Sequence, residues 1–417
     1  MKCMRAKAKG AKFTDPAFKI EIDKISSGFV DDITHFSNEF IGSLRDEDNL
    51  LDLAKATSLT AQWWEKLLHA TGGKLELQKC FFYMMYWVFN SEGEARLLSK
   101  NDTPSEVTIT DSETGETVHI TQQDCNVAHK TLGAMETPSG DYKPEVARLL
   151  AKSKSIAQKI STASINSSEA RIIYRSMYIP SINYSFPAGI LTLREAEQVQ
   201  GSTIQALLSA MGFTPGMPRA VVFGPTESGG IGLRHLFAEQ GTIKTMAIIQ
   251  QIRANRSLGK ILQIQLRWAQ RVAGTSEPIL ENTDIPLPHL QGEKWLGTLR
   301  EFLTRSELGI RVRGIHCPMT KRRSDQVLMD VACARIRSDE GVRRINRCRI
   351  YLHAESLSDL CNSEGTFITQ EAWDCTHKAQ IITNEAWPRQ PRPGKQHRKV
   401  WRTFLSNFCI DDTPLKL

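Results

Sequence analysis

The spacing of the apolar residues changes near Pro144, and this change constrains the fold more than any other feature of the sequence. Before it, the segment EVTITDSETGETVHITQ predicts a β-hairpin, because Val107 and Ile109 alternate with threonines and Val118 and Ile120 repeat the alternation after the turn. After it, apolar residues recur at the spacing of one helix face, at Val146, Leu149, Leu150, Ile156 and Ile160. The sequence therefore predicts an α+β chain, mixed up to residue 143 and mainly α-helical from residue 144.

Local patterns predict further elements in the mixed part. We expect short strands over 27–30 and 33–36, joined at Asp31-Asp32, and then a helix from about Asp46 to His69 that ends at the glycine pair 72–73. An aromatic strand is expected over 75–90, with 95–98 returning beside it, and a further short strand over 130–135.

In the helical part, Thr192 and Glu195 have the spacing of a capping box, which predicts a helix that ends near Gly212. Helices are also expected over 235–272, 293–307 and 324–338. A glycine-rich loop over 218–233 and a proline-rich linker near 388–393 interrupt them. The pattern predicts one boundary near residue 143, and the distribution of charge separates a basic last region, 311–417, from the region 144–310.

The positive charge is concentrated in the last region. The chain carries a net charge of +7, and residues 311–350 alone hold eleven Lys or Arg against four Asp or Glu, while 389–402 add six Lys or Arg and no acid. Clustered arginine near Trp and Tyr suits a phosphate backbone and stacked bases. A solvated helix face or a charged tail would have the same composition. The residues expected to contact nucleic acid are Arg322, Arg323, Arg343, Arg344, Arg347 and Arg349.

The stretch SSGFVDDITHF places two carboxylates side by side within an otherwise strand-like run. A tight strand–turn–strand exposes its tip, where paired carboxylates can bind a hard divalent cation. Polymerases need such a site, because two metal ions hold the attacking and leaving oxygens of phosphoryl transfer. A polar turn is the plain alternative, since aspartate is common in turns, and the same dipeptide recurs at Asp411-Asp412 without this context.

The order of motifs around Asp31-Asp32 resembles the second half of the palm of reverse transcriptases from retroelements without long terminal repeats. GFVDD is similar to the aspartate-pair motif, AQWWEKLLHATGGKLELQKC to the helix, glycine turn and lysine of the next palm motif, and HKTLGAM to the short strand that follows. The ordered resemblance covers about residues 25–140 and extends loosely to about 375. It implies a partial palm over 1–143, a helical thumb-like region over 144–310 and a basic C-terminal region over 311–417.

The resemblance also implies roles for single residues. In an intact relative, Asp31 and Asp32 would bind Mg²⁺ or Mn²⁺, with Asp31 as the principal ligand, and Lys79 would assist near the incoming triphosphate or the departing pyrophosphate. Leu132 and Gly133 would help to hold the primer end. The implied activity is RNA-directed DNA synthesis from deoxynucleoside triphosphates on an RNA or DNA template–primer. The ordinary alternatives are that Lys79 is a surface lysine at the start of a strand and that Leu132 and Gly133 belong to a core strand.

One part of the family pattern has no match. The palm takes a third carboxylate from a strand well upstream of the pair, and the fingers also lie upstream, yet only 30 residues precede Asp31. Asp15, Glu21 and Asp23 sit in no matching motif. We therefore expect a truncated palm that binds the metal ions poorly and that does not synthesise DNA in isolation. The alternative is a non-catalytic, basic helical protein, a domesticated remnant, that grips RNA or DNA.

Other features exclude some classes of protein. No run reaches the ~18 apolar residues of a membrane span, and the basic N-terminus lacks the apolar segment of a secretory signal. The nine cysteines have no framework spacing, so we expect reduced thiols in a protein of the nucleus or cytoplasm, without a membrane partner. The spacing of the late cysteines and histidines matches no common zinc finger; these are Cys348, His353, Cys361, Cys375 and His377. GPTESGGIG lacks the Lys-Ser/Thr of a phosphate loop and is interpreted as a loop before a helix.

Overall fold

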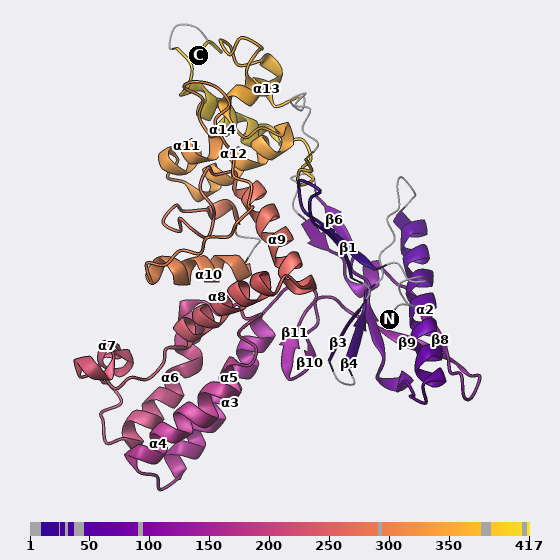
Figure 1. The fold of residues 1–417 in the computed structure, drawn as a ribbon, viewed down its shortest axis with the longest axis vertical. Helices are drawn as coiled ribbons and strands as arrows, with labels where there is room; N and C mark the ends of the chain where they lie inside the picture. The colour runs from indigo at the N-terminus through magenta and orange to yellow at the C-terminus, as the bar shows by residue number, and fades with distance from the viewer. Residues whose placement is uncertain are drawn as a thin grey trace. The chain divides into compact units, whose positions relative to one another are not determined.

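The computed structural model describes residues 10–24, 26–29, 32–36, 46–90, 95–290, 294–376, 385–410 and 415–417 (Figure 1). The chain has the predicted α+β class, with small sheets in its first part and a helical C-terminal region. It divides into two compact units. The first holds Met1–Ala128, Thr137–Ser139 and Thr383–Ala386, and the second holds His129–Glu136, Gly140–Ile382 and Trp387–Leu417. Within the described ranges, every helix is too short or too polar to cross a lipid bilayer.

The strands of the first unit are short. They are β1 (Ala11–Thr14), β2 (Glu21–Lys24), β3 (Ser26–Phe29), β4 (Asp32–His35), β5 (Phe81–Tyr83), β6 (Trp87–Phe89), β7 (Ala95–Leu97), β8 (Val107–Thr110) and β9 (Thr117–Gln123). Antiparallel pairs join β1 to β2, β3 to β4 and β6 to β7, while β5, β9 and β8 form one sheet in that order, with β5 parallel to β9. The predicted hairpin of β8 with β9 and the predicted return of β7 beside β6 are confirmed.

Helix α2 (Asp46–Ala70) covers the edge strand β8. The Gln62 amide donates to the Thr110 carbonyl at 2.8 Å and accepts from the Thr110 N–H at 2.7 Å. The Glu65 carboxylate accepts from both the N–H and the hydroxyl of Ser112. An edge strand leaves backbone N–H and C=O groups unpaired on its outer side. The side chains of Gln62 and Glu65 supply some of the hydrogen bonds that a further strand would make there. The apolar core beneath them consists of Ala54, Leu77, Phe82, Met84, Val107, Ile109 and Ile120.

Helix α2 ends as predicted. Gly72 has a φ of +80°, a left-handed conformation that glycine adopts without steric penalty, and the Gly73 N–H donates to the Leu68 carbonyl at 2.8 Å. The aromatic strand predicted over 75–90 is wrong in its extent. The chain forms a 3-10 turn at Leu77–Lys79 and then the separate strands β5 and β6. A single strand is impossible here because β5 and β6 belong to different sheets.

The second unit begins with a hairpin of β10 (His129–Thr131) and β11 (Ala134–Glu136), and its helices surround two cores. The helices around the first core are α3 (Lys143–Thr162), α4 (Ser167–Ile173), α5 (Ile179–Asn183), α6 (Leu193–Ala210), α7 (Arg219–Phe223), α8 (Leu236–Ala254), α9 (Ser257–Ala273) and α10 (Lys294–Arg305). Those of the second core are α11 (Leu328–Arg335), α12 (Asp339–Leu352), α13 (Gln370–Asp374) and α14 (Lys395–Ser406).

The helices expected over 235–272 and 293–307 are confirmed as α8 with α9 and as α10, and the helix expected over 324–338 is present only as the shorter α11. The capping box of α6 is also present, because the Thr192 N–H donates to Glu195 Oε2 at 2.9 Å and the Glu195 N–H donates to Thr192 Oγ1 at 3.3 Å. Helices α3 and α6 lie side by side (Figure 1). The buried Ser153 hydroxyl of α3 bonds to Thr203 of α6 at 2.7 Å and to the Tyr178 hydroxyl at 3.1 Å, so these three buried hydroxyl groups have partners.

Candidate functional site

The aspartate doublet follows strand β3 in the sequence, and its second residue, Asp32, begins strand β4. Strand β3 pairs antiparallel with β4 in a register that joins Ser26 to His35 and Phe29 to Asp32. The two predicted short strands are therefore confirmed, each beginning one residue earlier than expected. Asp31 lies outside the described residues, and of Asp32 only the backbone, at the start of β4, is described.

An aromatic contact anchors this hairpin on α2. The ring centroid of His35 lies 5.1 Å from that of Trp64, with the planes tilted by 58°. Burial lowers the pKa of His35, so the imidazole is neutral at pH 7 and packs as an aromatic ring. Neither of its ring nitrogens has a hydrogen-bond partner among the residues that the structure describes. The hairpin and the helix that follows it are thus held together by packing.

Lys79 lies in the 3-10 turn that leads from α2 into β5. Leu77 of the same turn is buried in the core under the sheet, while Lys79 is exposed. The nearby Lys74 is engaged by Glu113 at 2.5 Å, and this hydrogen bond raises the pKa of Lys74. Lys79 therefore belongs to the same compact unit as the aspartate hairpin and faces solvent. An ordinary surface lysine would occupy the same position.

The segment HKTLGAM is a hairpin, which corrects the single strand predicted over 130–135. Leu132 and Gly133 form its turn, with φ of +49° and +91°. Two successive residues with positive φ suit a two-residue turn between antiparallel strands, and glycine at the second position is the signal that the strand prediction overlooked. Leucine pays about 1–2 kcal/mol for this conformation, yet the side chain of Leu132 remains 41% exposed.

The same hairpin is fastened to α3. The Met135 N–H donates to Glu145 Oε2 at 2.8 Å, and Arg148 donates to both oxygens of Glu145 at 2.7 and 2.6 Å. Burial pushes the pKa of Glu145 up, but the hydrogen bonds from Arg148 and Met135 outweigh burial and hold the pKa below its ordinary value. A Cβ at Gly133 would lie 3.9 Å from the ring of the exposed Tyr184, so the turn and this ring are neighbours.

The arginines expected to meet nucleic acid differ in accessibility. Arg322 and Arg323 are exposed in the segment before α11, and Arg322 donates to the Ser363 carbonyl at 3.1 Å. Arg343 and Arg344 are half-buried near the start of α12, where both pair with the Glu340 side chain at 3.3 and 3.0 Å. Part of their charge is therefore neutralised within the helix, in pairs that salt screens readily.

Arg347 and Arg349 point toward other helices. Arg347 Nη1 lies 3.0 Å from Nε2 of His397 in α14. Arg349 is fully buried and donates to the carbonyls of Arg271 and Val272 at 2.8 and 3.0 Å, and to Asn346 Oδ1 at 2.9 Å. Those carbonyls end α9, where a helix leaves acceptors unpaired. Arg349 thus braces α12 against α9, and the expectation that it contacts a phosphate is corrected because no phosphate could reach a fully buried guanidinium.

Zinc binding by the late cysteines and histidines would require several of them to converge on one point. Within the described ranges, no group of three or more His, Cys, Asp or Glu side chains is arranged to hold a metal ion. Cys348 and Cys375 are buried in the second core, with the Cys375 sulfur 4.0 Å from the Cys348 carbonyl oxygen, and His353 stacks on Trp387 with centroids 5.2 Å apart. His377 lies outside the described residues.

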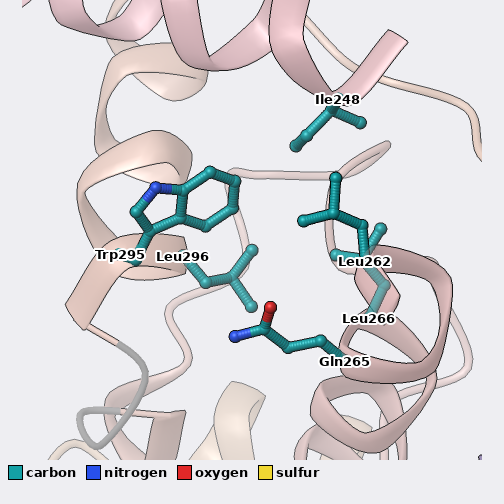
Figure 2. A pocket seen from close by; sticks show the side chains of 6 residues that line it. All are labelled: Ile248, Leu262, Gln265, Leu266, Trp295 and Leu296. Carbon is teal, nitrogen blue, oxygen red and sulfur yellow. The ribbon is translucent and has the colours of Figure 1, made fainter. Parts of the chain in front are cut away.

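Sequence reasoning missed a fully buried lysine. Lys244 of α8 places Nζ 2.5 Å from Thr298 Oγ1 and 5.2 Å from the centre of the Trp295 ring. Burial lowers the pKa of Lys244 to about 7. One helical turn further, α8 contributes to an apolar pocket in which Trp295 faces Leu262 (Figure 2), and the residues that line it are Ile248, Leu262, Gln265, Leu266, Trp295 and Leu296. The lysine inside the apolar run of TIKTMAII was the available signal.

Comparison of the chain with known protein families, with curated proteins and with solved structures finds no match. The function must therefore be inferred from the residues and their geometry.

Proposed function

We propose that the first unit descends from a reverse-transcriptase palm and that its aspartate doublet, Asp31 and Asp32, is a site for Mg²⁺ or Mn²⁺. The observation that carries this proposal is the pairing of β3 with β4, because Asp32 begins β4 opposite Phe29 and His35 of β4 contacts Trp64 of α2. Adjacent carboxylates supply the oxygen ligands that hard divalent cations prefer. Such a cation would stabilise charge that develops on a phosphate during nucleotidyl transfer.

The elements that follow the hairpin support the same proposal by their order. Helix α2 ends at Ala70, the left-handed Gly72 follows it, and the exposed Lys79 precedes β5. The motifs of the reverse-transcriptase palm follow the same order of hairpin, helix, glycine turn and lysine. In the proposal, the ammonium group of Lys79 neutralises phosphate oxygens of a nucleotide, for which its exposure is required.

The hairpin of the second unit supports contact with a nucleic-acid strand. Backbone strain persists where the surrounding structure enforces it, and it is frequent at binding sites. Leu132 carries such strain while remaining exposed, and the exposed ring of the adjacent Tyr184 offers a face on which a base could stack. Glu145 and Arg148 fix the position of the turn.

A second function, nucleic-acid binding without catalysis, is favoured by the exposure of Arg322 and Arg323. These side chains could neutralise backbone phosphates whether or not the doublet binds a metal ion. Counterion release would make that binding strongly dependent on salt.

The experiment measures Mn²⁺ uptake by electron paramagnetic resonance for the wild type and for two double variants. Asp31→Asn with Asp32→Asn removes the proposed site, while Asp411→Asn with Asp412→Asn is the matched control because it makes the same change at the other doublet. We expect the first variant to weaken Mn²⁺ binding about tenfold or more, because two of its charged ligands are lost, and the control to leave it unchanged. Equal binding by all three proteins would refute the metal site.

The same proteins are then titrated with a labelled RNA–DNA template–primer at several salt concentrations, together with Arg322→Glu, Arg323→Glu. Loss of two phosphate contacts should weaken binding and reduce the slope of log K against log salt by about two. Salt-dependent binding that survives in the aspartate variant, combined with unchanged Mn²⁺ uptake, would favour the non-catalytic function.

A further inference from the structure

A cavity of about 240 Å³ opens in the helical region around the first core of the second unit. It is lined by Arg175, Ile179 and Arg234. Two of these side chains are cationic and one is aliphatic. A water molecule occupies about 30 Å³ in the liquid, so the cavity has room for a phosphate group with part of the molecule to which it is esterified.

The backbone that presents Arg175 is a widened helical turn. Residues Tyr174–Tyr178 form a π-helical turn between α4 and α5, and Pro180 follows it. Proline has no N–H, and its ring clashes with the carbonyl four residues earlier, which disfavours regular α-helical bonding at this point. Wide turns of this kind occur frequently at binding sites. Arg175 lies within this turn and Ile179 directly follows it.

The backbone that presents Arg234 is held in place from the same turn. The Tyr174 hydroxyl donates to the Arg234 carbonyl at 2.5 Å, and Tyr174 itself is buried. Arg171, one helical turn before Arg175, donates from Nη1 to the Ile231 carbonyl at 3.0 Å. The segment 231–234 is therefore fixed against the helix by two hydrogen bonds, and the two lining arginines are held near each other before any ligand arrives.

The local charge is positive. Arg234 pairs with Glu239 at 3.4 Å, an exposed contact that salt and solvent weaken. Arg175 is exposed and has no carboxylate partner among the described residues. A guanidinium group presents donors in a planar fork that matches the oxygens of a phosphate, and Ile179 offers an apolar surface beside them.

We propose that the cavity lined by Arg175, Ile179 and Arg234 binds a phosphate group. The ligand class is a phosphate ester, either the monoester of a free nucleotide or the diester of a nucleic-acid strand. The site involves neither the aspartate doublet nor the basic residues after 311, so it stands independently of the function proposed above.

The test compares Arg175→Glu and Arg234→Ala with Arg253→Glu in the full chain. Arg253 is an exposed arginine in the last turn of α8 and lies outside the lining of the cavity, so it makes a matched charge-reversal control. Affinities for inorganic phosphate, adenosine monophosphate and a single-stranded oligonucleotide are measured by calorimetry, and folding is checked by thermal unfolding. We expect both cavity variants to lose about tenfold or more in affinity for at least one probe, as the loss of a charge-assisted contact implies, while Arg253→Glu binds like the wild type.

The three probes distinguish the source of the phosphate. Tighter binding of adenosine monophosphate than of the oligonucleotide, lost in Arg175→Glu, identifies a nucleotide site, and the reverse order identifies a contact with a nucleic-acid backbone. Failure of all three probes to bind the wild type would overturn the proposal. Equal weakening by Arg175→Glu and Arg253→Glu would also overturn it, because the effect would then come from net charge alone.

Discussion

Replacing Lys244 with methionine should stabilise the protein at neutral pH and remove a pH dependence of its unfolding free energy. Methionine is unbranched and close to lysine in length, so it fills the same space with little repacking. The substitution leaves no polar group stranded, because the Thr298 hydroxyl, which Lys244 contacts at 2.5 Å, also donates to the Trp295 carbonyl at 3.0 Å. The change therefore isolates the effect of burying a charge.

The magnitude follows from the pKa of Lys244. Burial lowers it from 10.5 to about 7 in the folded chain, so between these values the unfolded chain holds a proton that the folded chain has released. The unfolding free energy then rises with pH at about 1.4 kcal/mol per pH unit, or about 5 kcal/mol over the whole range. Below about pH 7 both states are protonated and the full cost of burial is present.

The assay is urea unfolding followed by circular dichroism at constant ionic strength, from about pH 7 to about pH 8.5, over which the wild type should gain about 2 kcal/mol. The window ends below the ordinary thiol pKa of 9.0, and the cysteines affect all three proteins alike, so their effect cancels in the difference between each variant and the wild type. Burial raises the pKa of Cys333 from 9.0 to about 11, which makes stability fall with pH once unfolded thiols ionise. Lys260→Met, at an exposed position of α9, is the matched control.

We expect the unfolding free energies of the wild type and Lys260→Met to rise in parallel across this window. The unfolding free energy of Lys244→Met should be higher than both and should lack the rise that comes from Lys244. If Lys244→Met kept the slope of the wild type, the buried amine could not be the titrating group. If it were less stable at pH 7, the contacts of the lysine with Thr298 and Trp295 would outweigh its desolvation.

Two other substitutions test the placement of predicted site residues. Arg349→Met should lower the unfolding free energy by about 2–4 kcal/mol, because buried acceptors at the end of α9 lose their donor, whereas Arg323→Met at an exposed position should change it by less than about 0.5 kcal/mol; similar effects of the two would contradict the assignment of Arg349 as a brace. Leu132→Asn should raise stability by about 1 kcal/mol in thermal unfolding, since asparagine tolerates positive φ better than leucine, and it should weaken template–primer binding if the leucine contacts a strand. A decrease in stability would show that Leu132 is not strained.

Local patterns predicted much of the fold. The helix that ends at Gly72, the capping box of Thr192 with Glu195, and the β8–β9 hairpin all depend on residues within a few positions of each other, and all are present. The β1–β2 hairpin and helices α12 and α14 were not predicted. Charged residues dominate the segments of α12 and α14. Those segments were therefore interpreted as binding surfaces, and the apolar residues that lie along one face of each helix were overlooked.

The candidate site was predicted less completely. The sequence located the doublet at Asp31-Asp32 between two short strands, because adjacent carboxylates in an apolar run are visible without coordinates. It gave no means of separating Arg349 from the exposed Arg323, since both lie in one basic stretch and differ only in what packs over them. Composition reports how much charge a segment carries, and burial decides which of those charges a ligand can reach.

The sequence by itself determined the class of the fold, the change from short strands to helices near residue 140, and the stops of α2 and α6. These properties follow from backbone conformational preference and apolar periodicity, which act over a few residues. Only the tertiary structure decided that Lys244 is enclosed, that Arg349 bridges α12 to α9, and that Arg175 and Arg234 line one cavity. Each of these depends on contacts between residues distant in the chain, whose energies arise only when the helices have packed.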